Sequence, residues 1–249
     1  MMTEILPGER VLFVRYSALG DVIQASPLAR ALKAQFPGVE LTWLVTSPLD
    51  DLVRGQPFVD DVLVWHRSRG ERGFVEMIRE VRRRKFHRMV SVQSSDRSAL
   101  LALLSGIPRR CGAHRWFSGV YDEGIDDLRK FLGFPPLRGA LEVTEEGRVW
   151  ALQELASLPP RRVGFAIGAS KAVKLWPDER WQELARELVA RGVGVLLLGD
   201  GEEERRRGEA LVRDLPFAQN AVSFYSLRQT LAAVGGGGRP GGGRFGGAP

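Results

Sequence analysis

Short apolar runs alternate with helical patterns along the first part of this chain. The apolar runs that favour strands are at residues 11–15, 40–45, 61–65, 88–92 and 110–112. Apolar positions at helical spacing predict helices over 22–35, 48–55, 73–84 and 95–104. This alternation is typical of βαβ units and a parallel sheet. We expect the first helix to kink or restart at Pro27, with Ser26 as a cap.

The alternation weakens at residues 113–140, which are rich in aromatic and turn residues, and a helical pattern returns at 144–158. Pro159-Pro160 is interpreted as a domain boundary. A second series follows, with a strand at 162–167, a loop at 168–176, a helix at 177–191, a strand at 193–198 and a helix at 202–215. We therefore predict an α/β protein of two Rossmann-like domains, 1–158 and 159–234. The second domain is predicted to be incomplete, because it ends after two strand–helix units.

The last segment, 235–249, has nine glycines in fifteen residues. This composition cannot bury a core, so a disordered tail is expected. One interpretation is a flexible functional tail. The favoured interpretation is a coding sequence altered by a frameshift or truncation, because GC-rich codons read out of frame give Gly, Arg, Pro and Ala.

The composition of the chain indicates the cellular compartment in which the protein works. The chain has 249 residues, 44% of them hydrophobic, and no run approaches the ~18 apolar residues that a membrane-spanning helix needs. The first ten residues lack the apolar centre of a signal peptide. Cys111 is the only cysteine, so no intrachain disulfide can form. Together these features predict a cytoplasmic protein.

The chain is basic, with a formal net charge of +6. A basic surface attracts nucleic acids, anionic lipid headgroups or phosphorylated sugars. No aromatic residues are interleaved with the arginine clusters as a nucleic-acid platform would require, so no nucleic-acid partner is predicted. The three histidines are scattered without ligand spacing, so no metal site is predicted.

The first motif that carries chemistry runs from Arg15 to Val22, where a strand passes through a small-residue turn into a helix. Ligands bind at such strand ends in open α/β sheets. Asp21 is a candidate general base there, although an acid in a first helical turn is also favoured by the helix dipole. Gly20 serves the turn and would let a substrate approach the backbone. Ser17 is a candidate for binding an acceptor phosphate or sugar hydroxyl, and it could equally cap the helix.

Two further loops are candidates for holding a nucleotide. The loop 168–176 contains Ser170 and Lys174 before a helix that starts near Pro177, which is the composition of an anion site. Such donors can stabilise a departing diphosphate without a metal. A second loop, Gly199-Asp200-Gly201, leads into Glu202 and Glu203. Neither this segment nor the first motif has the spacing of a G-x-G-x-x-G fingerprint, which disfavours a nicotinamide-dependent oxidoreductase.

The opening motif, Ser17-Ala18-Leu19-Gly20-Asp21-Val22, and the later Lys174-Leu175-Trp176-Pro177 together resemble glycosyltransferase family 9, the ADP-heptose:lipopolysaccharide heptosyltransferases. The resemblance implies the GT-B architecture, with no cofactor and no metal. It implies Asp21 as the catalytic base and Lys174 and Ser170 as contacts of the donor pyrophosphate. An acidic residue, Glu202 or Glu203, would meet the ribose.

The same resemblance implies an ADP-heptose-like donor and a lipid-linked lipopolysaccharide core acceptor. Such an acceptor places the enzyme at the cytoplasmic side of the inner membrane, where basic residues favour peripheral contact. The family also carries a later Asp-(Ser/Thr)-Gly-Pro-x-His-like segment, which this sequence lacks. The alternative is therefore an inactive, truncated relative of these enzymes that binds nucleotide weakly.

Overall fold

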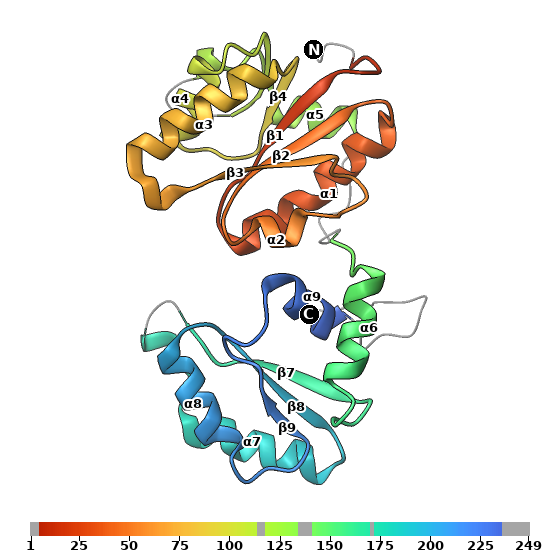
Figure 1. Ribbon diagram of the computed structural model, residues 1–249, viewed down its shortest axis with the longest axis vertical. Helices are drawn as coiled ribbons and strands as arrows, with labels where there is room; N and C mark the ends of the chain where they lie inside the picture. The colour runs from red at the N-terminus through yellow and green to blue at the C-terminus, as the bar shows by residue number, and fades with distance from the viewer. Residues whose placement is uncertain (1–4, 114–117, 134–140, 170–171, 236–249) are drawn as a thin grey trace. The chain divides into compact units, whose positions relative to one another are not determined.

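The computed structural model describes residues 5–113, 118–133, 141–169 and 172–235, which form two compact units (Figure 1). Unit 1 extends to Glu142 and unit 2 begins at Val143. The division therefore falls before the helix α6 (Glu145–Glu154) and differs from the predicted boundary at Pro159-Pro160. The reason is packing, because α6 lies against α9 (Leu227–Gly235). The predicted Gly-rich tail lies outside the described residues, apart from Gly235.

Unit 1 is built on a parallel sheet whose described strands have the order β3-β2-β1-β4-β5-β6. The strands are β1 (Arg10–Val14), β2 (Glu40–Thr46), β3 (Asp61–Trp65), β4 (Arg88–Ser91), β5 (Arg109–Gly112) and β6 (Glu123–Gly124). β1 pairs with both β2 and β4, with Val11 opposite Leu41 on one side and Arg88 on the other. The strand order reverses between β1 and β4, which is where doubly wound sheets bind ligands.

Helices cover both faces of this sheet (Figure 1). They are α1 (Leu19–Gln35), α2 (Asp50–Val53), α3 (Gly70–Arg84), α4 (Asp96–Leu104) and α5 (Ile125–Phe131), with short 3-10 turns η1 (Arg67–Arg69) and η2 (Ser118–Val120). On one face, Phe74 and Met77 of α3 and Leu101 of α4 pack against Leu12 and Leu44 of the strands. α1 lies on the other side of the sheet.

We expected the first helix to kink or restart at Pro27. It does not restart there, because α1 continues through Pro27 to Gln35. Proline has no N–H to donate to the carbonyl four residues earlier, which here belongs to Ile23. The Ser26 hydroxyl donates to that carbonyl at 2.6 Å. Ser26 is therefore not a cap: its side chain bonds the acceptor that Pro27 leaves unpaired, so the helix need not end there.

The starts of four strands in unit 1 are joined by ion pairs between three buried side chains and the partly exposed Arg109. Arg88 is fully buried at the start of β4, and its Nη1 donates to Glu123 Oε2 at 2.8 Å. Its Nε lies 3.3 Å from Glu9 Oε2, and Arg109 Nη1 lies 3.3 Å from Glu9 Oε1. These ion pairs lie at the amino-terminal ends of the strands. Ligands of such sheets bind at the carboxyl ends, so the role of these pairs is structural.

Unit 2 repeats the architecture with a smaller parallel sheet, whose described strands have the order β7-β8-β9. Its strands are β7 (Arg162–Ala166), β8 (Gly194–Leu198) and β9 (Ala218–Asn220), and its other helices are α7 (Asp178–Ala190), α8 (Glu202–Val212) and the 3-10 turn η3 (Ala172–Lys174). Phe165, Val195 and Leu197 form its core with Ala185 of α7 and Leu211 of α8. The two parallel sheets confirm the predicted α/β class with two Rossmann-like units.

Candidate functional site

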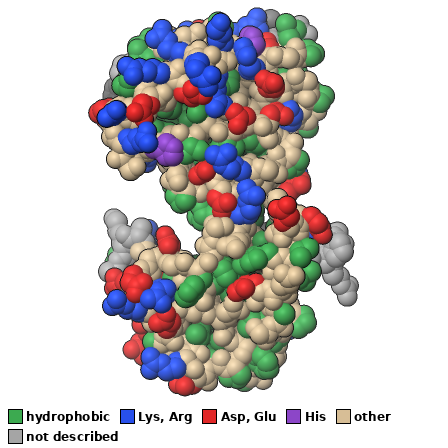
Figure 2. All heavy atoms as spheres, in the orientation of Figure 1, with side chains coloured by type: hydrophobic (Ala, Val, Ile, Leu, Met, Phe, Trp, Pro, Cys, Tyr) green, Lys and Arg blue, Asp and Glu red, His purple; other side chains and the backbone are tan. Residues whose placement is uncertain are grey.

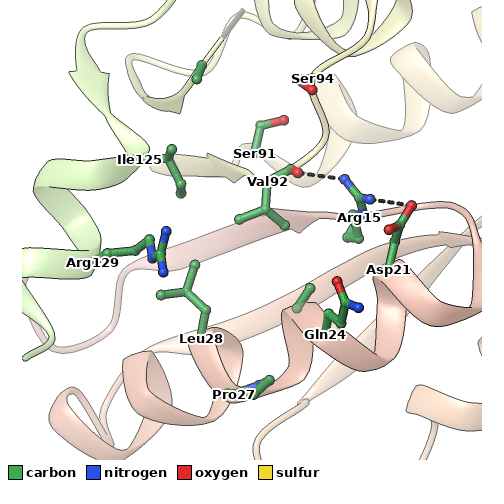
Figure 3. A pocket seen from close by; sticks show the side chains of 12 residues that line it. Arg15, Asp21, Gln24, Pro27, Leu28, Ser91, Val92, Ser94, Ile125 and Arg129 are labelled. Carbon is green, nitrogen blue, oxygen red and sulfur yellow. Dashed lines mark hydrogen bonds and ion pairs between the residues drawn. The ribbon is translucent and has the colours of Figure 1, made fainter. Parts of the chain in front are cut away.

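A pocket of about 480 Å³ opens at the switch point of the sheet in unit 1 (Figure 3). It collects residues from the ends of β1, β4 and β5 and from the helices α1 and α5. The lining residues are Arg15, Asp21, Gln24, Ala25, Pro27, Leu28, Ser91, Val92, Ser94, Ala113, Ile125 and Arg129. The middle of the pocket is mostly apolar. Asp21, Arg15 and Ser94 form its polar end, and the guanidinium of Arg129 lies at the opposite end (Figure 3). The pocket therefore suits a ligand that carries polar groups at both ends.

Asp21 stands in the first turn of α1, where its carboxylate is 45% exposed at the polar end of the pocket. Its Oδ2 accepts the backbone N–H of Ala18 at 3.1 Å, which closes a capping interaction at the start of the helix. The same oxygen forms an ion pair with Arg15. Among the residues that the structure describes, Oδ1 has no hydrogen-bond partner. One carboxylate oxygen is thus held by the protein, and the other is available to a ligand.

Arg15 fixes Asp21 relative to the neighbouring strand. Its Nη2 pairs with Asp21, and its Nη1 donates to the carbonyl of Val92 at 2.7 Å (Figure 3). The side chain is mostly buried, so these contacts are shielded from water. Arg15 belongs to the opening motif, but sequence reasoning gave it no role, since nothing in the sequence shows that the end of β4 lies beside it.

The two other residues predicted to act near Asp21, Gly20 and Ser17, do not line the pocket. Gly20 is exposed in the first turn of α1, and a Cβ built there would meet no described atom within 4 Å. Ser17 is half-buried and does not line the pocket. Ser94, which follows β4, does line it. Ser95 accepts the Ser98 backbone N–H at 3.3 Å as the cap of α4.

In unit 2, the candidate anion loop follows β7. Lys174 ends the short turn η3 and is exposed, while Ser170 lies outside the described residues. Trp176 is half exposed and packs edge-on against Trp181 of α7, with ring centroids 4.8 Å apart. The lysine is therefore free to reach a ligand, and Trp176 anchors the end of its loop to the next helix.

The two acidic candidates at the start of α8 are both exposed. Glu202 bonds Arg205 at 2.7 Å and Arg206 at 3.1 Å, and these guanidinium groups lower the pKa of its carboxyl to about 2. Glu202 therefore stays ionised, and its oxygens are already engaged on the helix surface. Glu203 is exposed without a described ion pair.

A third acid, Glu204, lies closest to the strand ends of unit 2, and sequence reasoning missed it. Its carboxylate accepts the backbone N–H of Asp200 at 3.1 Å. A Cβ at either Gly168 or Gly199 would overlap that carboxylate, so both positions need glycine for this arrangement. The signal in the sequence was its place in the first turn of the helix, where an acid can reach back to a free N–H.

Arg207 lies one turn further along α8 and holds the loop that carries Lys174. Its Nη1 donates to the carbonyl of Ile167 at 2.9 Å, and its Nη2 donates to that of Trp176 at 2.7 Å. Its Nε also pairs with Asp178 at the start of α7. One side chain therefore bonds both ends of the loop. Nothing in the neighbouring sequence indicates this role, because its partners lie 31 and 40 residues away.

Three other features bear on the predicted chemistry. Cys111 is buried in β5, and burial raises the pKa of its thiol to about 12, so it is suited to packing. No group of three or more metal-ligating side chains occurs among the described residues. None of the described helices is both long and apolar enough to cross a membrane.

Comparison with known proteins finds similarity to one family of enzymes. Residues 123–228 match the model of glycosyltransferase family 9 (heptosyltransferase). Lipopolysaccharide heptosyltransferase 2 of Escherichia coli is 23% identical over 231 residues, which is 81% of this chain and 66% of the relative. The chain thus spans just under two thirds of the length of that curated relative.

Solved structures show the same fold. The family 9 glycosyl transferase from Veillonella parvula superposes with a TM-score of 0.81 at 21% identity, covering 94% of this chain and 76% of that chain. E. coli heptosyltransferase WaaC, solved with ADP-2-deoxy-2-fluoro heptose, gives a TM-score of 0.71 at 18% identity, covering 91% of this chain and 80% of that chain. The similarity therefore extends over both units of the chain.

Proposed function

We propose that this chain, which matches glycosyltransferase family 9 over residues 123–228, is a glycosyltransferase that moves a heptose from an ADP-linked donor to the lipopolysaccharide inner core. The observation that carries the proposal is Asp21 at the polar end of the pocket in unit 1, held through one carboxylate oxygen only. The relatives are named as heptosyltransferases, and one was solved with an ADP-heptose analogue.

In the proposed reaction, Asp21 Oδ1 takes the proton of an acceptor hydroxyl as that oxygen attacks the anomeric carbon of the donor. The bond from that carbon to the diphosphate breaks, and ADP leaves with the electron pair. A single displacement of this kind inverts the anomeric carbon. Arg15 and the Ala18 N–H keep the carboxylate in place throughout, because they bond its other oxygen.

The donor is assigned to unit 2. Lys174 is exposed beside the start of α7 and carries the positive charge that a departing diphosphate requires. Ser170 is proposed as a second phosphate contact. Gly20 and Ser17 would contact the acceptor in unit 1. Glu202 and Glu203 remain candidates for the ribose, and Glu204, which lies against the two strand-end glycines, joins them. The proposed chemistry uses these side chains and needs no metal.

The acceptor proposed here is lipid-linked, which places the reaction at the cytoplasmic face of the inner membrane. The protein would reach it by peripheral contact rather than by a membrane span.

The base is tested with Asp21→Asn, which keeps the shape of the side chain and removes its basicity. Transfer should fall by about 10²- to 10⁴-fold, which is the usual contribution of a general base, while the affinity for ADP stays unchanged. The matched control is Asp50→Asn, since Asp50 is also a first-turn acid paired with an arginine but lies outside the pocket. Equal transfer by Asp21→Asn and wild type would rule out the base.

The donor contact is tested with Lys174→Ala. Loss of a charged hydrogen bond to a phosphate should weaken ADP binding roughly tenfold or more, as measured by calorimetry. AMP, which lacks the second phosphate, should be affected less. Arg180→Ala is the control, because Arg180 is an exposed cation on the next helix whose partner is Glu183. An ADP affinity that Lys174→Ala leaves unchanged would remove this residue from the diphosphate site.

Wild-type protein that binds ADP but gives no transfer with donor and acceptor present would favour the alternative, an inactive relative with nucleotide binding alone.

A further inference from the structure

α4 exposes a leucine stripe to solvent. Leu100, Leu103 and Leu104 are 43%, 59% and 42% exposed, whereas Leu101 and Ala102 of the same helix are buried in the core. Leu103 and Leu104 follow Leu100 by three and four residues, so the three side chains share one face of the helix. A helix that is apolar on both its inner and outer faces normally has something covering the outer one.

α3 runs beside α4 and extends this surface. At their starts, Glu71 Oε1 of α3 bonds Arg97 Nη2 of α4 at 2.6 Å. At their ends, Arg82 Nε lies 3.9 Å from the position of a Cβ built on Gly106, two residues after α4. Val75, Arg79 and Arg82 follow Glu71 at helical spacing on this flank, and Val75 is 44% exposed.

Cations border the leucines. Arg79 and Arg82 stand on α3, and both are exposed. Within the described part of the chain neither forms an ion pair, and the glutamates of α3 are paired with other arginines, so the charge of these two is not neutralised locally. Figure 2 shows Lys and Arg side chains gathered on this part of unit 1. Leu100, Leu103 and Leu104, together with Arg79 and Arg82, are called the leucine–arginine surface below.

We propose that the leucine–arginine surface docks on an anionic lipid bilayer. Exposed leucines bordered by uncompensated arginines have the composition of an interfacial membrane contact, where the apolar side chains enter the headgroup boundary and the cations meet acidic headgroups. A second copy of this chain fits less well. A two-fold contact through this face would bring the same two cations of each copy towards one another.

α4 begins beside the pocket and carries the leucines of the leucine–arginine surface. Ser94, immediately before the helix cap, lines the pocket, and the leucine stripe begins about two turns later. A nine-residue helix is about 14 Å long, so a bilayer beneath the stripe lies within reach of the site. This step rests on the proposed function, because a lipid-linked acceptor would then rise from the bilayer to Asp21 along one helix.

The test measures co-sedimentation of the full chain with vesicles of phosphatidylglycerol and phosphatidylcholine, and with vesicles of phosphatidylcholine alone. Partition should be at least about tenfold stronger on the anionic vesicles, and it should fall at high salt because exposed charges are then screened. Equal partition on both kinds of vesicle, or none on either, would overturn the proposal.

Variants locate the contact. Leu100→Ser/Leu103→Ser should reduce partition on anionic vesicles roughly tenfold, and Arg79→Gln/Arg82→Gln should reduce it and flatten its salt dependence. Leu152→Ser is the matched control, because Leu152 is 66% exposed on α6. The arginine variant leaves the apolar packing untouched, so it keeps the test valid if the leucine variant folds poorly. Partition that falls equally in the control, or in neither surface variant, would overturn the assignment.

Two outcomes distinguish membrane docking from self-association and from the proposed sugar transfer. Self-association in sedimentation velocity that the leucine variant abolishes, without any binding to anionic vesicles, would assign the surface to a second copy instead. Binding to anionic vesicles that depends on the leucines and arginines supports the membrane contact even where no sugar transfer is detected. In that case the proposed function would fail and the docking surface would stand.

Discussion

Arg15 and Arg88 are both largely buried in unit 1, but their partners give them different roles. Arg15 pairs with a carboxylate that is half exposed at the pocket, and its other contact is a carbonyl at the end of β4. Arg88 pairs with two buried carboxylates, Glu9 and Glu123, at the other end of the sheet. The first arginine therefore orders a site, whereas the second holds strands together.

Removing the Arg88 guanidinium should be costly. Arg88→Met removes the buried guanidinium that Glu9 and Glu123 share, and breaking a buried ion pair in this way costs about 3–5 kcal/mol. Urea unfolding followed by tryptophan fluorescence, to which the buried Trp43 and Trp65 of unit 1 contribute, measures the loss. Arg83→Met, which breaks a solvent-exposed pair with Glu80, should change the stability far less, because water screens that pair. Similar losses in the two variants would contradict the argument.

Adding Glu123→Gln to Arg88→Met should restore part of the stability, because the buried charge that faced Arg88 is then removed, while Glu9 keeps its pair with Arg109. A further loss would show that the Glu123 carboxylate stabilises unit 1 through other contacts.

At the scale of elements, unit 2 shows how one helix, α8, can hold the loop that follows a strand, β7. α8 presents Glu204 and Arg207, one turn apart, to the segment after β7. Glu204 fills the space left by Gly168 and Gly199, while Arg207 bonds the carbonyls of Ile167 and Trp176. We expect this packing to set the position of Lys174, because the loop is tied down at both ends.

Arg207→Ala should release the loop. Cleavage of native protein after Lys174 by a lysine-specific protease should become roughly tenfold faster, since local opening controls such cleavage. ADP binding should weaken in the same variant but not further when Lys174→Ala is already present, because Arg207 acts through that lysine. Arg206→Ala, which removes an exposed neighbour paired with Glu202, is the control. Additive effects of Arg207→Ala and Lys174→Ala on ADP affinity would exclude the positioning role.

At the scale of the whole molecule, the chain consists of two units, each with its own parallel sheet and core. The candidate base is in unit 1 and the candidate diphosphate contact is in unit 2. We propose that the acceptor and the donor are divided between the two cores in the same way, so that each unit responds to its own ligand.

ADP should therefore stabilise unit 2 selectively. At one hundred times its Kd, a ligand adds about 2.7 kcal/mol to the stability of the unit that binds it. Hydrogen exchange read by mass spectrometry should slow in peptides covering β7 and β8 and stay unchanged in those covering β1 and β4. Equal protection of both sheets would contradict the assignment of the donor to unit 2.

Sequence patterns along the chain were enough to predict most of the elements. β3 was predicted at its observed bounds, and β1, β2 and β4 to within one residue, because apolar runs and helical spacing are local properties. β6 and β9 were missed, since each is short and carries polar residues, and only pairing with a neighbouring strand makes them strands. The unit boundary also differed, because α6 packs on α9 from far along the chain.

The same distinction holds for the site. The sequence by itself placed Asp21 at a strand end and Lys174 in a loop before a helix, because a turn and a helix start are determined by adjacent residues. Only the tertiary structure decided that Arg15 bonds the end of β4, that Glu204 lies against two glycines, and that Arg207 ties a loop to α8. These contacts join residues distant in the chain, and their partners are set by the packing of strands and helices, which no local pattern records.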